Sequence, residues 1–320
     1  MSFPTSIHIS EEGPREGFQF EKGPITTARK VELIDALAKT GLDHIQIVSF
    51  VNPKAVPGMA DAEAVVETIK PEPGVAYTGL WFNEKGLERA RATGRLEITG
   101  SLFLSASEPF LKRNNNRTNQ QVEEEAHRMI DLYQAHGIPV ERCGVMAAFG
   151  CNFAGDVPVS RVTDLIQREV MIAREHGVIL KRVMLADTMA WATPILVKRV
   201  VGAVQEKFPD INISLHLHDT RGMGIANAFA GLEMGVTLYD ASVACLGGCP
   251  FAGHKGAAGN VCTEDLVFMC DEMGIETGID LEALCECARL AEDVVGHPLP
   301  GSVMKGGSLK KLREKIGTPA

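Results

Sequence analysis

The segment ISLHLHDTRG, from Ile213 to Gly222, places two histidines at alternate positions before it ends in Asp-Thr-Arg-Gly. Successive side chains of a β-strand point to opposite faces of its sheet, so His216 and His218 share one face and the leucines share the other. Two imidazoles that converge from one strand can bind a divalent metal ion, but they can also be hydrogen-bonded interior residues. The rest of the chain decides between these two interpretations.

Short β-like runs alternate with amphipathic helical runs along almost the whole chain. We predict strands at residues 7–10, 44–50, 75–82, 97–104, 141–147, 181–186, 211–218 and 239–244. Apolar residues with helical spacing lie between them, and several of these helices end at a glycine, as is typical before the next strand. This pattern predicts an α/β fold, a single (β/α)8 TIM barrel with extra C-terminal helices.

We expect one domain over residues 1–320, with the barrel at about 5–262 and a C-terminal helical segment at about 263–320. A doubly wound open sheet is the alternative fold. It is disfavoured because no GxGxxG sequence follows the first predicted strand.

The composition limits the possible partners. The formal net charge of −9 and the pI near 5.5 disfavour nucleic acid or an anionic membrane surface as the main partner. No apolar run approaches the roughly 18 residues of a membrane span, and the N-terminal residues match neither a signal peptide nor a transit peptide. We therefore expect a cytoplasmic protein whose cysteines are reduced and mostly buried.

Polar residues gather where a barrel places catalytic groups, at the carboxyl ends of strands and in the loops that follow. GPREG (residues 13–17) follows the first predicted strand and is expected to be a loop, while Asp187 and Thr188 follow the sixth. A carboxylate beside an arginine can bind metal or act as a base, and the arginine can stabilise an enolate; a solvated charge pair is the alternative. Together with the two histidines, oxygen ligands suit Mg²⁺ or Mn²⁺.

A glycine-rich loop runs from Gly247 to Asn260 after the eighth predicted strand. Such a loop can close over a ligand, or it can be a flexible surface connection. Cys249 has no apolar neighbours that would make it part of the core, and its thiol can serve as a general acid or base. Asn260 offers an amide oxygen that could complete a set of metal ligands.

Six stretches carry a family resemblance: GPREGFQ, VSFVNPKAVPGMAD, LADT, LHLHDT, GGCPFA and GNVCTEDLVFM. They occur in a consistent order over about residues 7–300, and the chain thereby resembles 3-hydroxy-3-methylglutaryl-CoA lyase and its relatives among the divalent-metal TIM-barrel lyases. The resemblance implies a (β/α)8 barrel, usually dimeric, and an acyl-CoA substrate. It also implies a retro-Claisen cleavage that releases acetyl-CoA and acetoacetate.

The resemblance assigns a role to each matching position. Four residues would bind Mg²⁺ or Mn²⁺: Glu16, His216, His218 and Asn260. Three would be catalytic, namely Arg15 at the enolate, Cys249 as its proton donor, and Asp187 near the substrate hydroxyl. Four would contact the substrate: Arg15, Gln19, Gln46 and Thr188.

Three features depart from the family pattern. Glu16 stands where the family has aspartate, which moves the carboxylate by ~1 Å. Gln46 stands where these lyases usually have glutamate, so a negative charge is missing beside Arg15, which is freer to pair with substrate or with Glu16. The glycine-rich loop is longer around residues 253–255, and Ala55 replaces an aromatic residue. These changes indicate a site reshaped for a bulkier or differently substituted acyl group.

Two other functions stay open. One is a related aldolase or Claisen-type synthase, for example one that acts on a 2-oxo acid, although such synthases generally carry larger C-terminal additions than this chain has. The other is a non-catalytic homologue that binds metal or acyl-CoA. The presence of both histidines, Arg15, Cys249 and Asn260 argues against lost chemistry.

Overall fold

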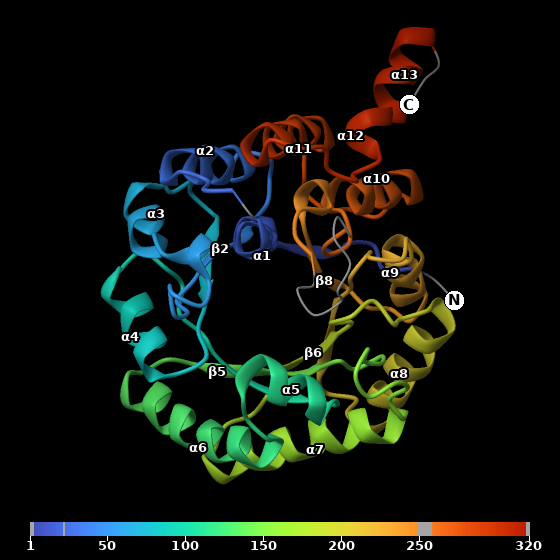
Figure 1. The fold of residues 1–320 in the computed structure, drawn as a ribbon. Helices are drawn as coiled ribbons and strands as arrows, with labels where there is room; N and C mark the ends of the chain where they lie inside the picture. Colours follow the sequence, from blue (N-terminus) through green and yellow to red (C-terminus); the bar gives the residue numbers. More distant parts are fainter. Residues whose placement is uncertain (1–2, 22, 249–257, 318–320) are drawn as a thin grey trace.

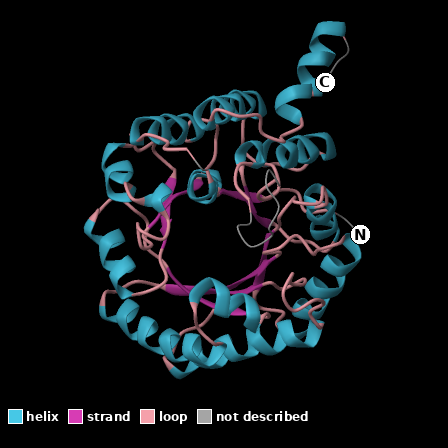
Figure 2. Cartoon of the chain, in the orientation of Figure 1, coloured by secondary structure: helices cyan, strands magenta, loops and turns pink. Residues whose placement is uncertain are grey.

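The computed structural model describes residues 3–21, 23–248 and 258–317. Eight strands are present: β1 (His8–Glu11), β2 (His44–Ser49), β3 (Ala76–Leu80), β4 (Gly100–Ser105), β5 (Val140–Met146), β6 (Arg182–Ala186), β7 (Asn212–His216) and β8 (Leu238–Ala241). They pair in parallel in the order β3-β2-β1-β8-β7-β6-β5-β4. The sheet curls into a ring of strands inside a ring of helices (Figure 2). The predicted barrel is confirmed, and the predicted strand ends differ from the observed ones by three residues or fewer.

The helices follow the strands in the order expected of a barrel, and most of them form the outer circle (Figure 1). Their bounds are α1 (Gly13–Phe20), α2 (Thr27–Leu37), α3 (Ala62–Thr68), α4 (Glu84–Ala92), α5 (Glu108–Asn115), α6 (Asn119–Ala135), α7 (Val159–Glu175), α8 (Pro194–Lys207), α9 (Gly224–Glu233), α10 (Thr263–Met273), α11 (Leu281–Val295), α12 (Val303–Gly306) and α13 (Leu309–Ile316), with 3-10 turns η1 (Pro57–Met59) and η2 (Val243–Cys245). In Figure 1, α1 and α5 lie inside the outer circle, over the ring of strands, and α13 projects away from it.

The GPREG segment is helical, so the expectation of a loop there was wrong. α1 begins at Gly13 directly after β1, and proline in its first turn is favourable because the N–H groups of that turn have no partner within the helix. The buried carboxylate of Glu11 accepts a hydrogen bond from the Gly13 N–H at 2.8 Å and fixes this turn. Arg15 and Glu16 are therefore held on a helix rather than on a loop.

The core lies between the strands and the outer helices. Leu215 and Leu217 are fully buried, and a side chain on Gly231 of α9 would collide with Leu215, which shows that this leucine points outward to the helices. All seven described cysteines are buried, as expected. None of the helices in the described part of the chain is long and apolar enough to cross a membrane. The division into one domain stays a prediction.

Candidate active site and metal centre

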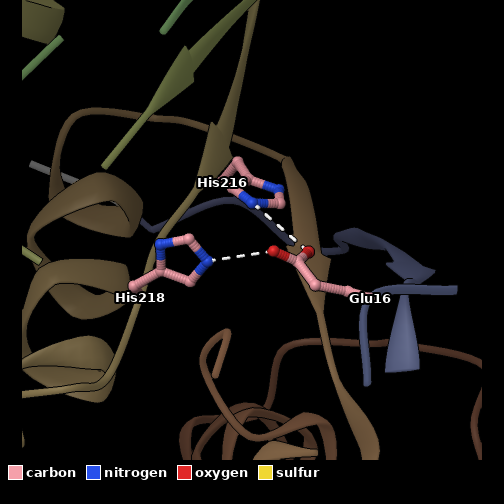
Figure 3. A group of neighbouring side chains, drawn as sticks. All are labelled: Glu16, His216 and His218. Carbon is pink, nitrogen blue, oxygen red and sulfur yellow. Dashed lines mark hydrogen bonds and ion pairs between the residues drawn. The ribbon is translucent and has the colours of Figure 1, made fainter. Parts of the chain in front are cut away.

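One carboxylate and two imidazoles meet at the carboxyl ends of β1 and β7. Glu16 on α1 faces His216, the last residue of β7, and His218 two residues further along (Figure 3). His218 Nε2 lies 3.2 Å from Glu16 Oε1, and His216 Nε2 lies 3.6 Å from Glu16 Oε2. The three side chains are buried, and their ligand atoms lie within 4.8 Å of one another. Such a group of nitrogen and oxygen donors could hold a divalent metal ion.

The second nitrogen of each imidazole fixes which atom is free to bind metal. His216 Nδ1 donates to Asp240 Oδ2 at 3.0 Å, and His218 Nδ1 donates to the Asp187 carbonyl oxygen at 2.9 Å. Because both partners accept hydrogen bonds, each ring carries a hydrogen on Nδ1, and its Nε2, which faces Glu16, is the nitrogen that a metal ion would bind. This arrangement is typical of metal-binding histidines.

Asn260 completes the group from the segment that follows β8. It forms an antiparallel bridge with His218, and its Nδ2 donates to Glu16 Oε2 at 2.9 Å. Its Oδ1 is buried and has no hydrogen-bond partner among the described residues. A buried carbonyl oxygen without a partner is costly, so its position beside two imidazoles and a carboxylate fits a bound cation.

The electrostatics of the group also favour a cation. Burial opposes ionisation of Glu16, but Arg15 and the two histidines hold its pKa below the ordinary value. Burial opposes protonation of His216, but Glu16 and Asp240 raise its pKa to about 9. The carboxylates that attract a proton to His216 would equally attract a metal ion.

Arg15 is held on three sides. Its Nε donates to Gln46 Oε1, its Nη2 donates to Glu12 Oε2, and the same Nη2 lies 3.4 Å from Glu16 Oε2. Gln46 therefore does not leave Arg15 free, because Glu12 supplies a carboxylate beside it. Glu12 is buried, and although Arg15 favours its ionised form, burial raises its pKa.

A cavity of about 760 Å³ opens beside these groups and continues into the barrel. It is lined by residues of the candidate site and by side chains from inside the ring, among them Arg15, Glu16, Gln19, Gln46, Ala55, Thr188, His216 and His218. Gln19 accepts a hydrogen bond from Ser49 at 2.8 Å, and Thr188 accepts one from the Ala147 N–H at 2.9 Å. The cavity thus brings together most of the residues expected from the sequence.

Asp187 is placed differently from the other expected residues. Its Oδ1 accepts from the backbone N–H groups of Trp191 and Ala192, at 2.7 and 3.0 Å, and its carboxylate is not part of the cavity lining. Burial raises its pKa to about 6. The backbone carbonyl oxygen of Asp187 accepts the hydrogen bond from His218 Nδ1 and so orients this imidazole. Cys249 lies outside the described residues.

Sequence reasoning missed two acids of the site, Glu12 and Asp240. Glu12 directly precedes the GPREG segment that was singled out, and Asp240 lies in the eighth predicted strand. The signal for Asp240 was its position: it faces the barrel interior one strand away from His216, its register partner. Glu12 contacts Arg15 and Asp240 contacts His216, two residues that the sequence predicts to be functional.

A comparison with protein families matches residues 6–291 to a family model described as HMGL-like. Among curated proteins, the chain is 38% identical over 300 residues to a hydroxymethylglutaryl-CoA lyase of Bacillus subtilis (strain 168), which covers 94% of this chain and 97% of that protein. It is 39% identical over 285 residues to the mitochondrial hydroxymethylglutaryl-CoA lyase of Gallus gallus, covering 89% and 92%.

Solved structures give the same similarity in three dimensions. An HMG-CoA lyase of Bacillus subtilis superposes with a TM-score of 0.88 at 36% identity, covering 96% of this chain and 99% of that one. An HMG-CoA lyase of Acinetobacter baumannii, solved with coenzyme A and 3-methylmalate, superposes with a TM-score of 0.85 at 36% identity, covering 96% and 97%. The similarity therefore extends over the whole ring and over the elements that carry the site.

Proposed function

This chain belongs to the HMGL-like family, and we propose that it is a carbon–carbon lyase that depends on a divalent metal ion. It cleaves a 3-hydroxy-3-methylglutaryl-CoA-like thioester, in a retro-Claisen reaction, to acetyl-CoA and a 3-oxo acid such as acetoacetate. The observation that carries this proposal is the group of Glu16, His216, His218 and the unpartnered Asn260 Oδ1 beside Arg15 at the cavity. The names of the relatives support the same reaction class.

The four residues of this group are the proposed metal ligands, and we propose Mg²⁺ or Mn²⁺ because the set mixes imidazole nitrogens with carboxylate and amide oxygens. A metal ion bound there would polarise the oxygen atoms of the substrate as a Lewis acid. Asp240 and the Asp187 carbonyl oxygen keep both histidines in the tautomer that binds it.

The remaining residues act on the substrate. When the C2–C3 bond breaks, the C3 hydroxyl gives its proton to a carboxylate of the site and becomes the ketone of the 3-oxo acid, while the electron pair of the bond passes to C2, the enolate carbon of acetyl-CoA. The Arg15 guanidinium stabilises the enolate charge, since its position is fixed by Glu12 and Gln46. Gln19, Gln46 and Thr188 line the acyl site, and Asp187 positions His218.

Cys249 is proposed as the acid that protonates the enolate carbon. We expect Cys249→Ser to bind metal as the unaltered protein does and to lose most of its turnover, because a serine hydroxyl is a much weaker acid than a thiol. Calorimetric titration with Mn²⁺ and steady-state rates measure the two effects separately. Loss of metal binding in this variant would show that the role of Cys249 is misassigned.

The first experiment is cleavage of 3-hydroxy-3-methylglutaryl-CoA by the purified protein with Mg²⁺ or Mn²⁺, followed by acetoacetate release. Cleavage that disappears with a chelator and returns with metal is the expected result. A protein that binds metal but cleaves no 3-hydroxyacyl thioester would overturn the proposal in favour of a non-catalytic homologue, and release of a 2-oxo acid from another substrate would favour the aldolase alternative.

We also propose a homodimer in the cytoplasm, with an acyl-CoA as the small-molecule partner and with neither nucleic acid nor a membrane as a partner. The acidic composition supports the last two points. Sedimentation velocity at micromolar concentration tests the dimer.

A further inference from the structure

Two arginines lie side by side inside the barrel, in the same cavity as the candidate metal ligands. Arg142 on β5 and Arg182 on β6 are register partners across the sheet, and both line the cavity. Like charges that face each other on adjacent strands destabilise a sheet. An arginine does not lose its proton in a protein, so this repulsion is not relieved by deprotonation.

Among the described residues, no aspartate or glutamate carboxylate lies within 4 Å of either guanidinium. Residues 1–2, 22, 249–257 and 318–320, which the structure does not describe, contain no aspartate or glutamate. The two nearby acids have other partners: Asp240 accepts from His216, and Glu141 pairs with Lys181. Arg142 Nε is buried and has no hydrogen-bond partner among the described residues. Burial and the charge of Arg142 lower the pKa of Arg182, and the charges of Asp240 and Glu141 oppose this shift only in part.

His44 adds a third hydrogen-bonding group to this part of the cavity. Its Nε2 shares a hydrogen bond with Thr78 at 3.2 Å, whereas its buried Nδ1 has no partner in the described part of the chain. Burial, followed by the charge of Arg142, lowers the pKa of His44 to about 4, so the ring is neutral. A neutral imidazole with a free nitrogen beside two arginines is suited to hydrogen-bond a bound anion.

We propose that Arg142 and Arg182 bind a carboxylate at the far end of the substrate's acyl group. This inference rests on the proposed function for the thioester end, and it names the class of acyl group: one that carries an anionic end deep in the barrel. The neutral Gln46 lies in the same cavity, so it adds no negative charge that would repel such a group. In this proposal coenzyme A lies at the end of the cavity that carries the candidate metal ligands, at the carboxyl ends of the strands.

The strand register sets the length of this acyl group. His216 pairs with Ala186, and Arg182 lies four residues earlier on β6, which corresponds to ~13 Å along a strand at ~3.3 Å per residue. The proposal requires Arg182 to extend along the cavity toward the metal group; its side chain then covers ~6–7 Å of this distance and leaves ~6 Å, or about five carbon–carbon bonds of an extended chain. Counted from the thioester carbonyl carbon C1, the carboxylate carbon of 3-hydroxy-3-methylglutaryl-CoA is about four bonds away, so it falls about one bond short of the arginines. A dicarboxylate of six carbons spans the gap.

The test is calorimetric binding of adipate and of its monoamide to the full-length protein loaded with Mg²⁺. The two probes have the same length and differ by one charge. We expect adipate to bind at least tenfold more tightly than the monoamide, and we expect this ratio to fall to near one in Arg142→Met/Arg182→Met. Arg182→Lys should keep most of the ratio because it retains the charge. Arg199→Met, on the exposed surface of α8, is the matched control and should not change it.

Equal affinities for adipate and its monoamide in the unaltered protein would overturn the proposal, and so would a ratio that persists in the double methionine variant. If the double variant does not fold, the comparison of the two probes in the unaltered protein and in Arg182→Lys still decides the question. Failure of the proposed function gives a different result. A protein that binds adipate through its arginines but cleaves no thioester would support the anion site and contradict the lyase assignment.

Discussion

At the scale of single residues, the orientation of Arg15 depends on a carboxylate that the family resemblance did not lead us to expect. The resemblance places an acid at position 46, where this chain has glutamine, and the structure shows that Glu12 supplies the negative charge from the other side of the guanidinium. We expect Glu12→Gln to lower kcat by about tenfold or more, roughly 1.4 kcal/mol of transition-state stabilisation, with little change in metal affinity. Steady-state kinetics and Mn²⁺ titration measure the two quantities.

The control for Glu12→Gln is the double variant Glu12→Gln/Gln46→Glu. It returns a carboxylate to the neighbourhood of Arg15, so it should recover a large part of kcat, which a loss of folding would not allow. An unchanged kcat in the single variant, or a double variant no faster than the single one, would show that Glu12 does not position Arg15.

Asp240 acts at the same scale through His216. Its carboxylate accepts the Nδ1 hydrogen at 3.0 Å, so Nε2 is the nitrogen that would bind the proposed metal ion. Replacing such a partner of a metal-binding histidine typically weakens metal affinity 10–100-fold. We expect Asp240→Asn to show a loss in this range by calorimetry with Mn²⁺, while Asp164→Asn, on an exposed part of α7, leaves the affinity unchanged. Equal affinities in both variants would contradict the role of Asp240.

At the scale of elements, Glu11 joins the end of β1 to three others. Its carboxylate accepts from the Gly13 and Val243 N–H groups and from the Thr263 hydroxyl, in α1, η2 and α10. Burial raises its pKa to about 8, although these hydrogen bonds favour the ionised form. η2 also contains Ala244 at φ 55°, a left-handed conformation that these contacts help to hold.

The raised pKa of Glu11 predicts a pH dependence of folding. Between pH 4.5 and about 8 the folded protein keeps the Glu11 proton and the unfolded chain releases it, so this group makes the free energy of unfolding fall as pH rises, by at most ~1.4 kcal/mol per pH unit. Glu11→Gln removes the effect while conserving the shape. Urea unfolding at pH 5.5 and pH 8 should show that this variant gains stability relative to the unaltered protein at the higher pH. Parallel changes in the two proteins would contradict the assignment.

The elements also show how far the sequence could lead. All eight strands were predictable, because burial of one face of a strand or helix produces an apolar pattern of period 2 or 3.6 in the sequence. The glycines predicted to end helices, at 41, 94, 137 and 177, all have positive φ. The helix at residues 13–20 was not predictable from Gly-Pro-Arg-Glu-Gly, whose glycines and proline are typical of a loop. Only the packing of this segment over the ring, with Glu11 below its first turn, makes it helical.

The site shows the same limit. Residue type and strand position were enough to predict that His216, His218, Glu16 and Asn260 lie together, as they do, and their role as ligands stays a proposal. Glu12, Asp240 and the arginines inside the barrel could not, because their importance comes from contacts across strands that are distant in sequence.

At the scale of the whole molecule, the ring of strands has one weak position, the junction between β3 and β4, where the strands are not paired by a hydrogen-bonded ladder. β3 and β4 are the two ends of the hydrogen-bonded order. Among the described residues, one backbone hydrogen bond joins this part of the ring, from the Glu97 N–H, three residues before β4, to the Tyr77 carbonyl of β3 at 2.8 Å. By contrast, β6 has hydrogen-bonded neighbours on both sides. Local opening is easiest where few backbone hydrogen bonds must break.

We therefore expect amide hydrogens of β3 to exchange faster than those of β6, measured by mass spectrometry on peptides that cover residues 76–80 and 182–186. Leu80 of β3 and Phe103 of β4 both line the cavity, so the weak position borders the space in which the substrate would bind. A ligand that fills the cavity and contacts both strands should slow exchange in β3 more than in β6, since it adds contacts where the sheet lacks them. Equal protection of the two strands without ligand would show that side-chain packing alone closes the ring between β3 and β4.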